Sequence, residues 1–364
     1  MLVTGIVLLV LITAVYLFLQ HPKFGKLPSG TRLEKIRKSP NYRDGKFQNL
    51  SFTPDLAEGE TFFKVLKKVL FEKDKRNKPK QTMPSQKTNL HGLNAQENIL
   101  VWFGHSSYFL QIDGKKILVD PVFSGAASPI PITTKSFKGA DVYTTDDIPE
   151  IDYLFITHDH WDHLDYDTVT KLKPKVKTVI TGLGTGAHLE HWGFNPDIII
   201  EKDWDETIEL PDGFTVHTVP GRHFAGRLFK RNQVLWMSFV LQTPNRKIFI
   251  GGDSGYDTHF SKTGNDYEPF DVAILECGQY NESWKNIHLM PGEIVPAAKY
   301  LKAKALMPVH WGKFSLALHA WDEPVTLASA AAQAVNLPLW TPLIGEKVNL
   351  DAPGTFEPWW KAVD

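Results

Sequence analysis

Residues 158–163 read His-Asp-His-Trp-Asp-His, and these residue types at this spacing are typical of a metal-binding site. Neutral imidazoles and carboxylates are the usual ligands of zinc in proteins when no thiolate is used. The run follows directly on a stretch of apolar residues that predicts a strand. On an extended chain residues two apart share a side, so His158 and His160 can bind one ion together. Asp162 and His163 then turn away from the strand and can serve a second ion.

Complete sites for two ions need more ligands than this run provides, and later parts of the chain offer them. His223, Asp253 and His310 each follow closely on a predicted apolar strand. Since α/β folds place their sites where strands end, we expect these three residues to complete the two sites. Taken singly, each of the three has an equally good structural explanation. The prediction rests on their combination with the cluster.

Several further residues are candidates for supporting the ligands or contacting a substrate: His105, Asp120, Trp161, Asp165, Gln279 and His288. We expect Asp120, which ends a predicted strand, to orient a ligand by a hydrogen bond, as residues around metal ligands commonly do. His105 is expected either to do the same or to serve a purely structural role. Asp165 either braces the cluster or acts as an ordinary carboxylate at the start of a helix.

Polar residues in the loop-rich parts of the chain could contact a phosphate. Gln279 and His288 are the candidates for contacting a substrate phosphate. Arg222 and Arg227 could bind phosphate oxygens, although exposed arginines commonly do not. Cys277 lies in a strand-like run, and we expect it to be part of the core rather than a nucleophile.

The elements that must position these residues are short apolar strands interleaved with helical patterns. Strands are predicted at residues 99–103, 108–112, 116–119, 152–156, 176–181, 198–200, 215–219, 236–242, 247–250, 272–275 and 305–308. Helices are predicted at 290–302 and 324–335, and another begins at 168–172. Asp113-Gly114 is a hairpin signal. Strands that alternate with helices, but also form hairpins, favour an α/β protein with mixed sheets.

Residues 1–20 are predicted to form a transmembrane anchor. Residues 1–19 carry no charged side chain, and their length matches a single bilayer span. A cleaved signal peptide is the alternative, but the run has neither a basic start nor a small-residue cleavage site. Basic residues follow between Lys23 and Lys38. The positive-inside rule therefore places this flank and the catalytic domain in the cytoplasm, beneath an inner or plasma membrane.

Residues 21–97 are predicted to form a juxtamembrane segment that precedes the main domain at 98–364. Proline and glycine punctuate residues 21–55, for which a mostly extended chain is expected. Residues 61–71 place apolar side chains at helical spacing and lysines elsewhere, which predicts an amphipathic helix. This helix could lie on an anionic bilayer or pack on the main domain, with equal weight. Residues 73–97 are typical of a loop or linker.

The composition sets broad limits on function. The chain has 364 residues, of which 42% are hydrophobic, so it can bury a large core. The formal net charge of −1 gives no reason to expect a nucleic acid as partner, because general nucleic-acid binders usually carry a basic excess. A single cysteine excludes an intramolecular disulfide. The composition makes no prediction about oligomeric state.

The whole constellation resembles the metallo-β-lactamase superfamily, whose fold is an αββα sandwich with the metals at one edge of two packed sheets. It is most similar to the N-acylphosphatidylethanolamine-hydrolysing phospholipase D family, over roughly residues 98–350. The matching runs are Trp-Phe-Gly-His-Ser-Ser at 102–107, Asp-Pro-Val-Phe-Ser at 120–124, Ala-Ser-Pro at 127–129, Leu-Asp-Tyr at 164–166, Gly-Asp-Ser-Gly-Tyr at 252–256 and His-Trp-Gly-Lys-Phe at 310–314. Trp161 departs from the pattern, because the phospholipase has a tyrosine there.

The resemblance implies an assignment of ligands and a reaction. One metal would be bound by His158, His160 and His223, and the other by Asp162, His163 and His310, with Asp253 bridging. The metals would be two zinc ions, with iron or manganese as alternatives. The hypothesis is that hydroxide held between the metals attacks phosphorus of N-acylphosphatidylethanolamine or a related phospholipid, with Asp253 and Asp162 as the catalytic carboxylates.

Other functions remain open within the same fold. A lactonase or another small-ester hydrolase is the first alternative. A nuclease is less favoured, because of the balanced charge and the membrane anchor. A non-catalytic membrane adaptor would be expected to have lost metal ligands, whereas this chain retains all of those that the resemblance implies.

Overall fold

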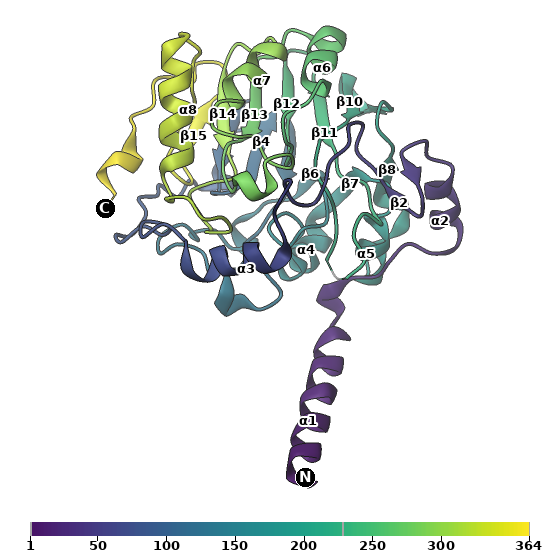
Figure 1. Ribbon diagram of the computed structural model, residues 1–364. Coiled ribbons are helices and arrows are strands. Elements are labelled where there is room, and N and C mark those ends of the chain that lie inside the picture. Colours follow the sequence, from purple (N-terminus) through teal and green to yellow (C-terminus); the bar gives the residue numbers. More distant parts are fainter. Residues whose placement is uncertain (1, 228, 364) are drawn as a thin grey trace.

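Two mixed β-sheets pack face to face in the computed structural model, which describes residues 2–227 and 229–363. Helices cover the outer faces of both sheets, so the layers follow the predicted αββα order (Figure 1). Phe155 of one sheet packs edge-on against Phe239 of the other, with ring centroids 5.0 Å apart. The main apolar core therefore lies between the two sheets.

The first sheet holds the metal-binding run. Its strands, in spatial order, are β15 (Lys347–Asn349), β3 (Ile99–Trp102), β4 (Tyr108–Ile112), β5 (Lys115–Val119), β6 (Ile151–Ile156), β7 (Val176–Gly182) and β8 (Ile199–Lys202). Strands β5 to β8 are parallel and the others antiparallel. Leu100 and Trp102 face the core between the sheets, whereas Ile99 and Val101 face α4 (Tyr166–Leu172) and α5 (Gly186–His191). Burial of both faces explains why these strands are apolar throughout.

The second sheet is also mixed. Its strands, in spatial order, are β14 (Leu306–Val309), β13 (Val272–Glu276), β12 (Lys247–Ile250), β11 (Ser238–Gln242), β10 (Phe214–Val219) and β9 (Thr207–Leu210). Its associated helices are α6 (His259–Tyr267), α7 (Ile294–Tyr300) and α8 (Glu323–Ala334). Strands β12 to β14 are parallel, and β9 to β12 run antiparallel to their neighbours. The carboxyl ends of β10, β12, β13 and β14 consequently meet at one edge.

The N-terminal part adds α1 (Leu2–Leu19), α2 (Gly30–Arg37), the short strands β1 (Tyr42–Arg43) and β2 (Lys46–Phe47), and α3 (Phe62–Phe71). Helix α1 extends away from the domain, and none of its residues is buried (Figure 1). Within the described ranges it alone is long and apolar enough to cross a bilayer. A signal sequence would pass the same test of length and composition.

The expectation of a mostly extended chain at residues 21–55 did not include α2, which lies there. Pro28 and Pro40 lie outside this helix and Gly30 begins it, so these residues delimit the helix rather than prevent it. Ile36 of α2 is completely buried in the core between the sheets. The amphipathic helix predicted at residues 61–71 is present as α3.

Most predicted strands are present within a few residues of their expected ends. The patterns did not predict β9 and β15, which are short strands at sheet edges with partly exposed residues. Helix α6 was not predicted either, because its sequence contains glycine and several polar residues. Gly264 is needed there, because a Cβ atom would lie 1.8 Å from the Tyr300 carbonyl oxygen. Close packing of α6 on α7 therefore overrides local helix propensity.

Candidate metal centre

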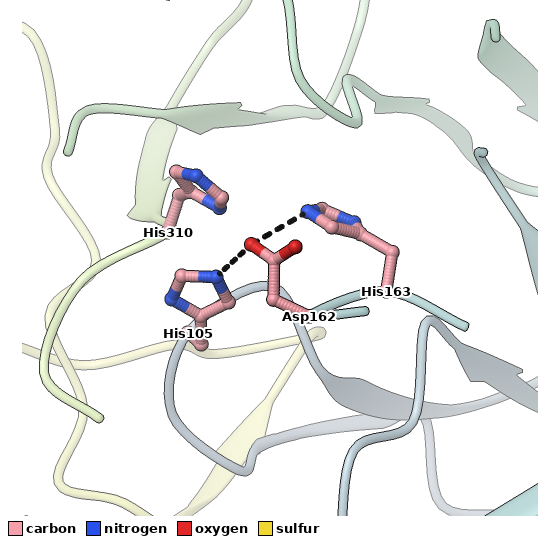
Figure 2. Close-up of side chains that lie close together, drawn as sticks. All are labelled: His105, Asp162, His163 and His310. Atoms are coloured by element: carbon pink, nitrogen blue, oxygen red, sulfur yellow. Dashed lines mark hydrogen bonds and ion pairs between the residues drawn. The ribbon is translucent and has the colours of Figure 1, made fainter. Parts of the chain in front are cut away.

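The predicted ligands converge at the edge where the strands of both sheets end. Among the described residues there are three groups of candidate ligand atoms, and within each group the atoms lie within 4.8 Å of one another. Two of these groups together contain every predicted ligand. The first group consists of His158, His160, His223 and Asp253. The second group consists of Asp162, His163, His310 and His105 (Figure 2). The third group joins Asp253 and His310 to Glu276 and His288. All of these residues are buried except His160, which is half-buried.

Asp253, at the end of β12, lies between the two groups. Its Oδ2 atom is 3.1 Å from Nε2 of His163, 3.7 Å from Nε2 of His223 and 3.8 Å from Nε2 of His158. Its Oδ1 atom is 3.2 Å from Nδ1 of His310. One carboxylate therefore faces ligands of both groups, which is the position that the resemblance gives to a bridging ligand.

A glycine before Asp253 allows this approach. Gly252 has a φ of 59°, and a Cβ atom there would lie 2.9 Å from Cβ of Thr157, the residue before the cluster. Any side chain would therefore strain the backbone and push the end of β12 away from the cluster.

The spacing of the first group fits a shared cation. Nδ1 of His160 lies 2.9 Å from Nε2 of His158 and 3.2 Å from Nε2 of His223. Two nitrogens bound to one tetrahedral zinc ion lie about 3.3 Å apart when each bond is about 2.0 Å. Among the described residues, Nε2 of His163 and Oδ1 of Asp253 are buried without a hydrogen-bond partner. Buried polar atoms are rarely left in that state unless they face a ligand.

The protonation of the imidazoles also suits metal binding. Burial, together with the neighbouring imidazoles, lowers the pKa of His158, His223 and His310 well below the usual histidine value. Neutral imidazoles keep the lone pair that a metal ligand needs. His163 differs: burial opposes its proton, but the carboxylates of Asp253 and others outweigh burial and raise its pKa.

The carboxylates respond to the same burial. Burial raises the pKa of Asp253 to about 6, although His163 counteracts part of this effect. Burial would also raise the pKa of Asp162, but the imidazoles of His163 and His105 outweigh it and hold this pKa well below its usual range. A buried cluster of carboxylates and imidazoles is chemically suited to a divalent cation, whose charge would compensate that of the carboxylates.

Neighbouring side chains orient the ligands of the second group. Each ligand has one such hydrogen bond of 2.8 Å, linking His105 to Asp162, Asp120 to His163 and Ser106 to His310. Figure 2 shows Asp162 between His105 and His163. In the first group, Nδ1 of His223 contacts the carbonyl oxygen of Ile287 at 2.7 Å. Such contacts fix the ring orientation and the tautomer of a metal-binding histidine.

Comparison with known proteins agrees with this geometry. A family model described as the β-lactamase superfamily domain matches residues 115–311. The chain belongs to the metallo-β-lactamase superfamily. An uncharacterised protein of Mycobacterium tuberculosis is 38% identical over 332 residues, which cover 89% of this chain and 88% of that protein. N-acyl-phosphatidylethanolamine-hydrolyzing phospholipase D 1 of Caenorhabditis elegans is 28% identical over 300 residues, 75% of this chain and 83% of that enzyme.

The fold has close counterparts among solved structures. A metallo hydrolase from Ignicoccus hospitalis superposes with a TM-score of 0.55 at 19% identity, covering 70% of this chain and 98% of that one. At this identity the likeness shows the metallo-β-lactamase fold alone.

Two of the residues that were predicted to support the ligands or to contact a substrate, Asp165 and Trp161, have side chains that contact other parts of this metallo-β-lactamase protein instead. Asp165 accepts hydrogen bonds from the Ser124 amide at 2.9 Å and the Thr168 hydroxyl at 2.5 Å, so it joins a loop to α4. Trp161 packs against Phe24 and Arg227 rather than lining the pocket. Trp161 therefore supports the cluster loop from outside, whereas Asp165 acts as a carboxylate at the start of α4.

The expectation that Gln279 contacts a substrate phosphate is wrong, because its side-chain amide has no bonding capacity left. The amide nitrogen donates to the carbonyl oxygens of His310 and Phe314, and the amide oxygen accepts from the amides of Leu316 and Ala317. Gln279 lines the pocket but serves to shape the chain after His310.

The contacts of the two arginines suggested as phosphate ligands lie within the protein. Arg222 donates to the carbonyl oxygens of Phe52 and Tyr256 and to the Thr53 hydroxyl. Arg227 is buried and donates to backbone carbonyls alone among the described residues. Both guanidinium groups are therefore occupied within the protein.

His288 lines the pocket, and its contact with a substrate phosphate stays a prediction; its partner in the protein was not predicted. Its Nδ1 lies 2.9 and 3.1 Å from the carboxylate oxygens of Glu276, which is buried at the end of β13. Burial raises the pKa of Glu276 well above its usual value. Glu276 follows an apolar strand just as Asp120 and Asp253 do, so the strand-end rule could have identified it.

Several of the candidate ligands line a cavity of about 290 Å³. The sequence did not predict the apolar residues that form part of its wall. Leu56, Phe62 and Val65 line it, although they lie far from the cluster in sequence. Asp55 and Arg231, 3.0 Å apart, form an ion pair at its rim. The N-terminal segment, including α3, therefore completes the pocket of the metallo-β-lactamase domain.

Proposed function

We propose that this protein is a membrane-anchored phosphodiesterase that uses two zinc ions for phospholipase D-type hydrolysis of N-acylphosphatidylethanolamine or a related phospholipid. The observation that carries the proposal is the convergence of two groups of buried ligands on Asp253, at the floor of a pocket with an apolar wall. The substrate class is supported by the activity for which the C. elegans relative is named.

The chain's own residues account for much of the chemistry. Two divalent cations held by the two groups would activate water and neutralise charge on phosphoryl oxygens. Asp253 faces both groups and can accept a hydrogen bond that orients an attacking water. Asp162 is held in place by His105. Glu276 engages Nδ1 of His288, so Nε2 is the atom through which His288 can contact a substrate phosphate.

The pocket wall supports a lipid substrate. Phe62 and Val65 of α3 face the pocket, where they suit the apolar part of a phospholipid. Phe63 and Phe71 of the same helix are each 77% exposed. A monomeric protein rarely leaves so much apolar surface in water unless that surface binds a partner or a membrane.

The position of α3 supports a membrane as that partner. In Figure 1, α3 lies along the side of the domain from which α1 extends. We propose that α1 anchors the protein in an inner or plasma membrane with the catalytic domain in the cytoplasm. In that arrangement the exposed apolar residues of α3 lie on the bilayer surface, and the pocket opens near its lipids.

A substrate panel tests the proposal. The purified full-length chain, in detergent and loaded with zinc, iron or manganese in parallel, is offered N-acylphosphatidylethanolamine, a soluble phosphodiester, a lactone and single-stranded RNA. We expect release of phosphatidic acid from the first, some turnover of the second and none of the others. Turnover of the lactone alone would instead establish a small-ester hydrolase, and cleavage of RNA alone a nuclease.

A further inference from the structure

We infer that Arg227 is a positioning residue that fastens the metal-binding loop to the segment that follows α1. Arg227 is only 5% exposed, although it carries a charge and lies in the loop after the ligand His223. Burial lowers the pKa of Arg227 to about 10, which leaves it charged at neutral pH. A buried guanidinium is retained only where its donors are well satisfied.

One side of the guanidinium holds the metal-binding loop. Its Nη1 atom donates to the carbonyl oxygens of Asp159 at 2.9 Å and Leu164 at 2.6 Å. Candidate metal ligands lie between these two residues in the sequence. A single nitrogen therefore binds the loop on both sides of those ligands. The guanidinium carbon also lies 3.9 Å from the centre of the Trp161 ring. The loop is therefore held both by its backbone and by the stacked tryptophan.

The other side of the guanidinium holds the exit segment, which we define as residues 21–28. Nε and Nη2 of Arg227 donate to the Lys23 carbonyl oxygen at 3.2 and 2.9 Å. Phe24 of the exit segment packs edge-on against Trp161, with ring centroids 5.4 Å apart. Four of the five N–H donors of arginine are thus used, all on backbone carbonyls.

A second route joins the exit segment to the same loop. The amide of Lys26 donates to Nδ1 of His188 at 3.0 Å. The opposite ring nitrogen of His188, Nε2, lies 3.2 Å from Oδ2 of Asp159. Oδ1 of Asp159 accepts a hydrogen bond of 2.6 Å from the Gly226 amide, directly before Arg227. The loop, the exit segment and the chain after His223 therefore form one connected unit.

This unit bears on metal binding, because the loop carries several ligands within a few residues. A loop that is free to move must lose that freedom when it binds an ion, whereas a loop already held in place does not. Loss of groups that orient metal ligands typically weakens metal binding by about 10- to 100-fold. The inference rests on the proposed metal centre, and its test separates the two.

The test measures zinc affinity in the full-length chain, purified in detergent, by competition with a chromophoric chelator. Arg227→Met removes the donors but keeps an apolar chain of similar length. We expect it to weaken zinc binding by about 10- to 100-fold. Arg227→Lys should recover little of this loss, because one ammonium group cannot span carbonyls on both sides.

Arg32→Met is the matched control. Arg32 also ties the N-terminal part to the domain, through ion pairs of 2.6 Å with Glu201 and 2.5 Å with Glu190. These partners lie in β8 and α5 rather than in the metal-binding loop. Zinc affinity should therefore stay at the wild-type value. Hydrogen exchange, measured well below the unfolding temperature, should accelerate at residues 158–165 in Arg227→Met and not in Arg32→Met.

Phe24→Ala tests the link from the exit segment and remains informative if Arg227→Met does not fold. It should weaken zinc binding several-fold, because Trp161 loses its partner on that side. Wild-type zinc affinity in folded Arg227→Met, or in both Arg227→Lys and Phe24→Ala, would overturn the inference while leaving the metal centre intact. Absence of zinc binding by the wild-type chain would overturn the metal centre as well.

Discussion

The floor and the wall of the candidate active-site pocket are built by different physical means. The floor consists of buried polar side chains at strand ends, and ligands such as His163 and His310 are each held by a hydrogen bond of 2.8 Å. The apolar wall is shared: Phe224, Trp284, Ile287 and Leu316 come from loops of the main domain, and Leu56, Phe62 and Val65 come from an N-terminal segment with many exposed apolar residues. Under the proposed function, the sheets supply the chemistry, and the N-terminal part of the wall contributes to the choice of substrate.

The largest effect is expected when the floor loses the residue that both ligand groups share. Asp253→Ala should lower kcat on a soluble phosphodiester by on the order of a thousandfold or more, because the floor loses its central carboxylate. Bound zinc per chain should fall at the same time, as measured by elemental analysis. Asp266→Ala, which changes a half-exposed aspartate on α6, is the control. Unchanged turnover and metal content in Asp253→Ala would contradict our account of the floor.

A smaller effect is expected when the floor loses a supporting residue. Asp120→Asn weakens the hydrogen bond to Nδ1 of His163, so zinc affinity should fall by about 10- to 100-fold. The larger loss should concern the ion of the second group, because Asp120 contacts His163 directly and reaches His158 of the first group only through the Thr157 hydroxyl. A zinc titration that shows equal weakening of both ions would argue against this separation.

A change in the wall should distinguish lipids from soluble substrates. Phe62→Ser combined with Val65→Ser should raise KM for phospholipid in vesicles by about thirtyfold, because each apolar side chain that a bound lipid covers contributes on the order of 1 kcal/mol. Turnover of a soluble phosphodiester should stay unchanged. Glu58→Ser, an exposed position in the preceding loop, is the control. Equal losses on both substrates would show that the wall supports the chemistry rather than selecting the lipid.

The smallest effect concerns the charged side of α3. Lys64→Gln with Lys67→Gln should lower activity on anionic vesicles several-fold at low salt, since lysines near such a surface are attracted to its anionic lipids. The difference should disappear on neutral vesicles and at high salt, because salt screens exposed charges. A loss that persists on neutral vesicles would point to a structural role for these lysines.

The difference between the floor and the wall of the pocket also explains which residues could be predicted from the sequence. Ligands such as His163 and Asp253 were predictable because each follows an apolar strand, and Glu276 obeys the same rule. The contact between α3 and the pocket was not predictable, because helical periodicity identifies an apolar face without saying what it meets. Arg227 illustrates the same limit: its residue type suggested a phosphate, whereas the fold directs it to backbone carbonyls.

Zinc-edge anomalous diffraction from crystals of the full-length chain grown with zinc tests the metal centre most directly. The account predicts two peaks in the pocket floor: one about 2.0–2.2 Å from the nitrogens of His158, His160 and His223, the other similarly placed against Asp162, His163 and His310. Both peaks should lie against Asp253. Anomalous peaks confined to other parts of the protein, or their absence at saturating zinc, would contradict it.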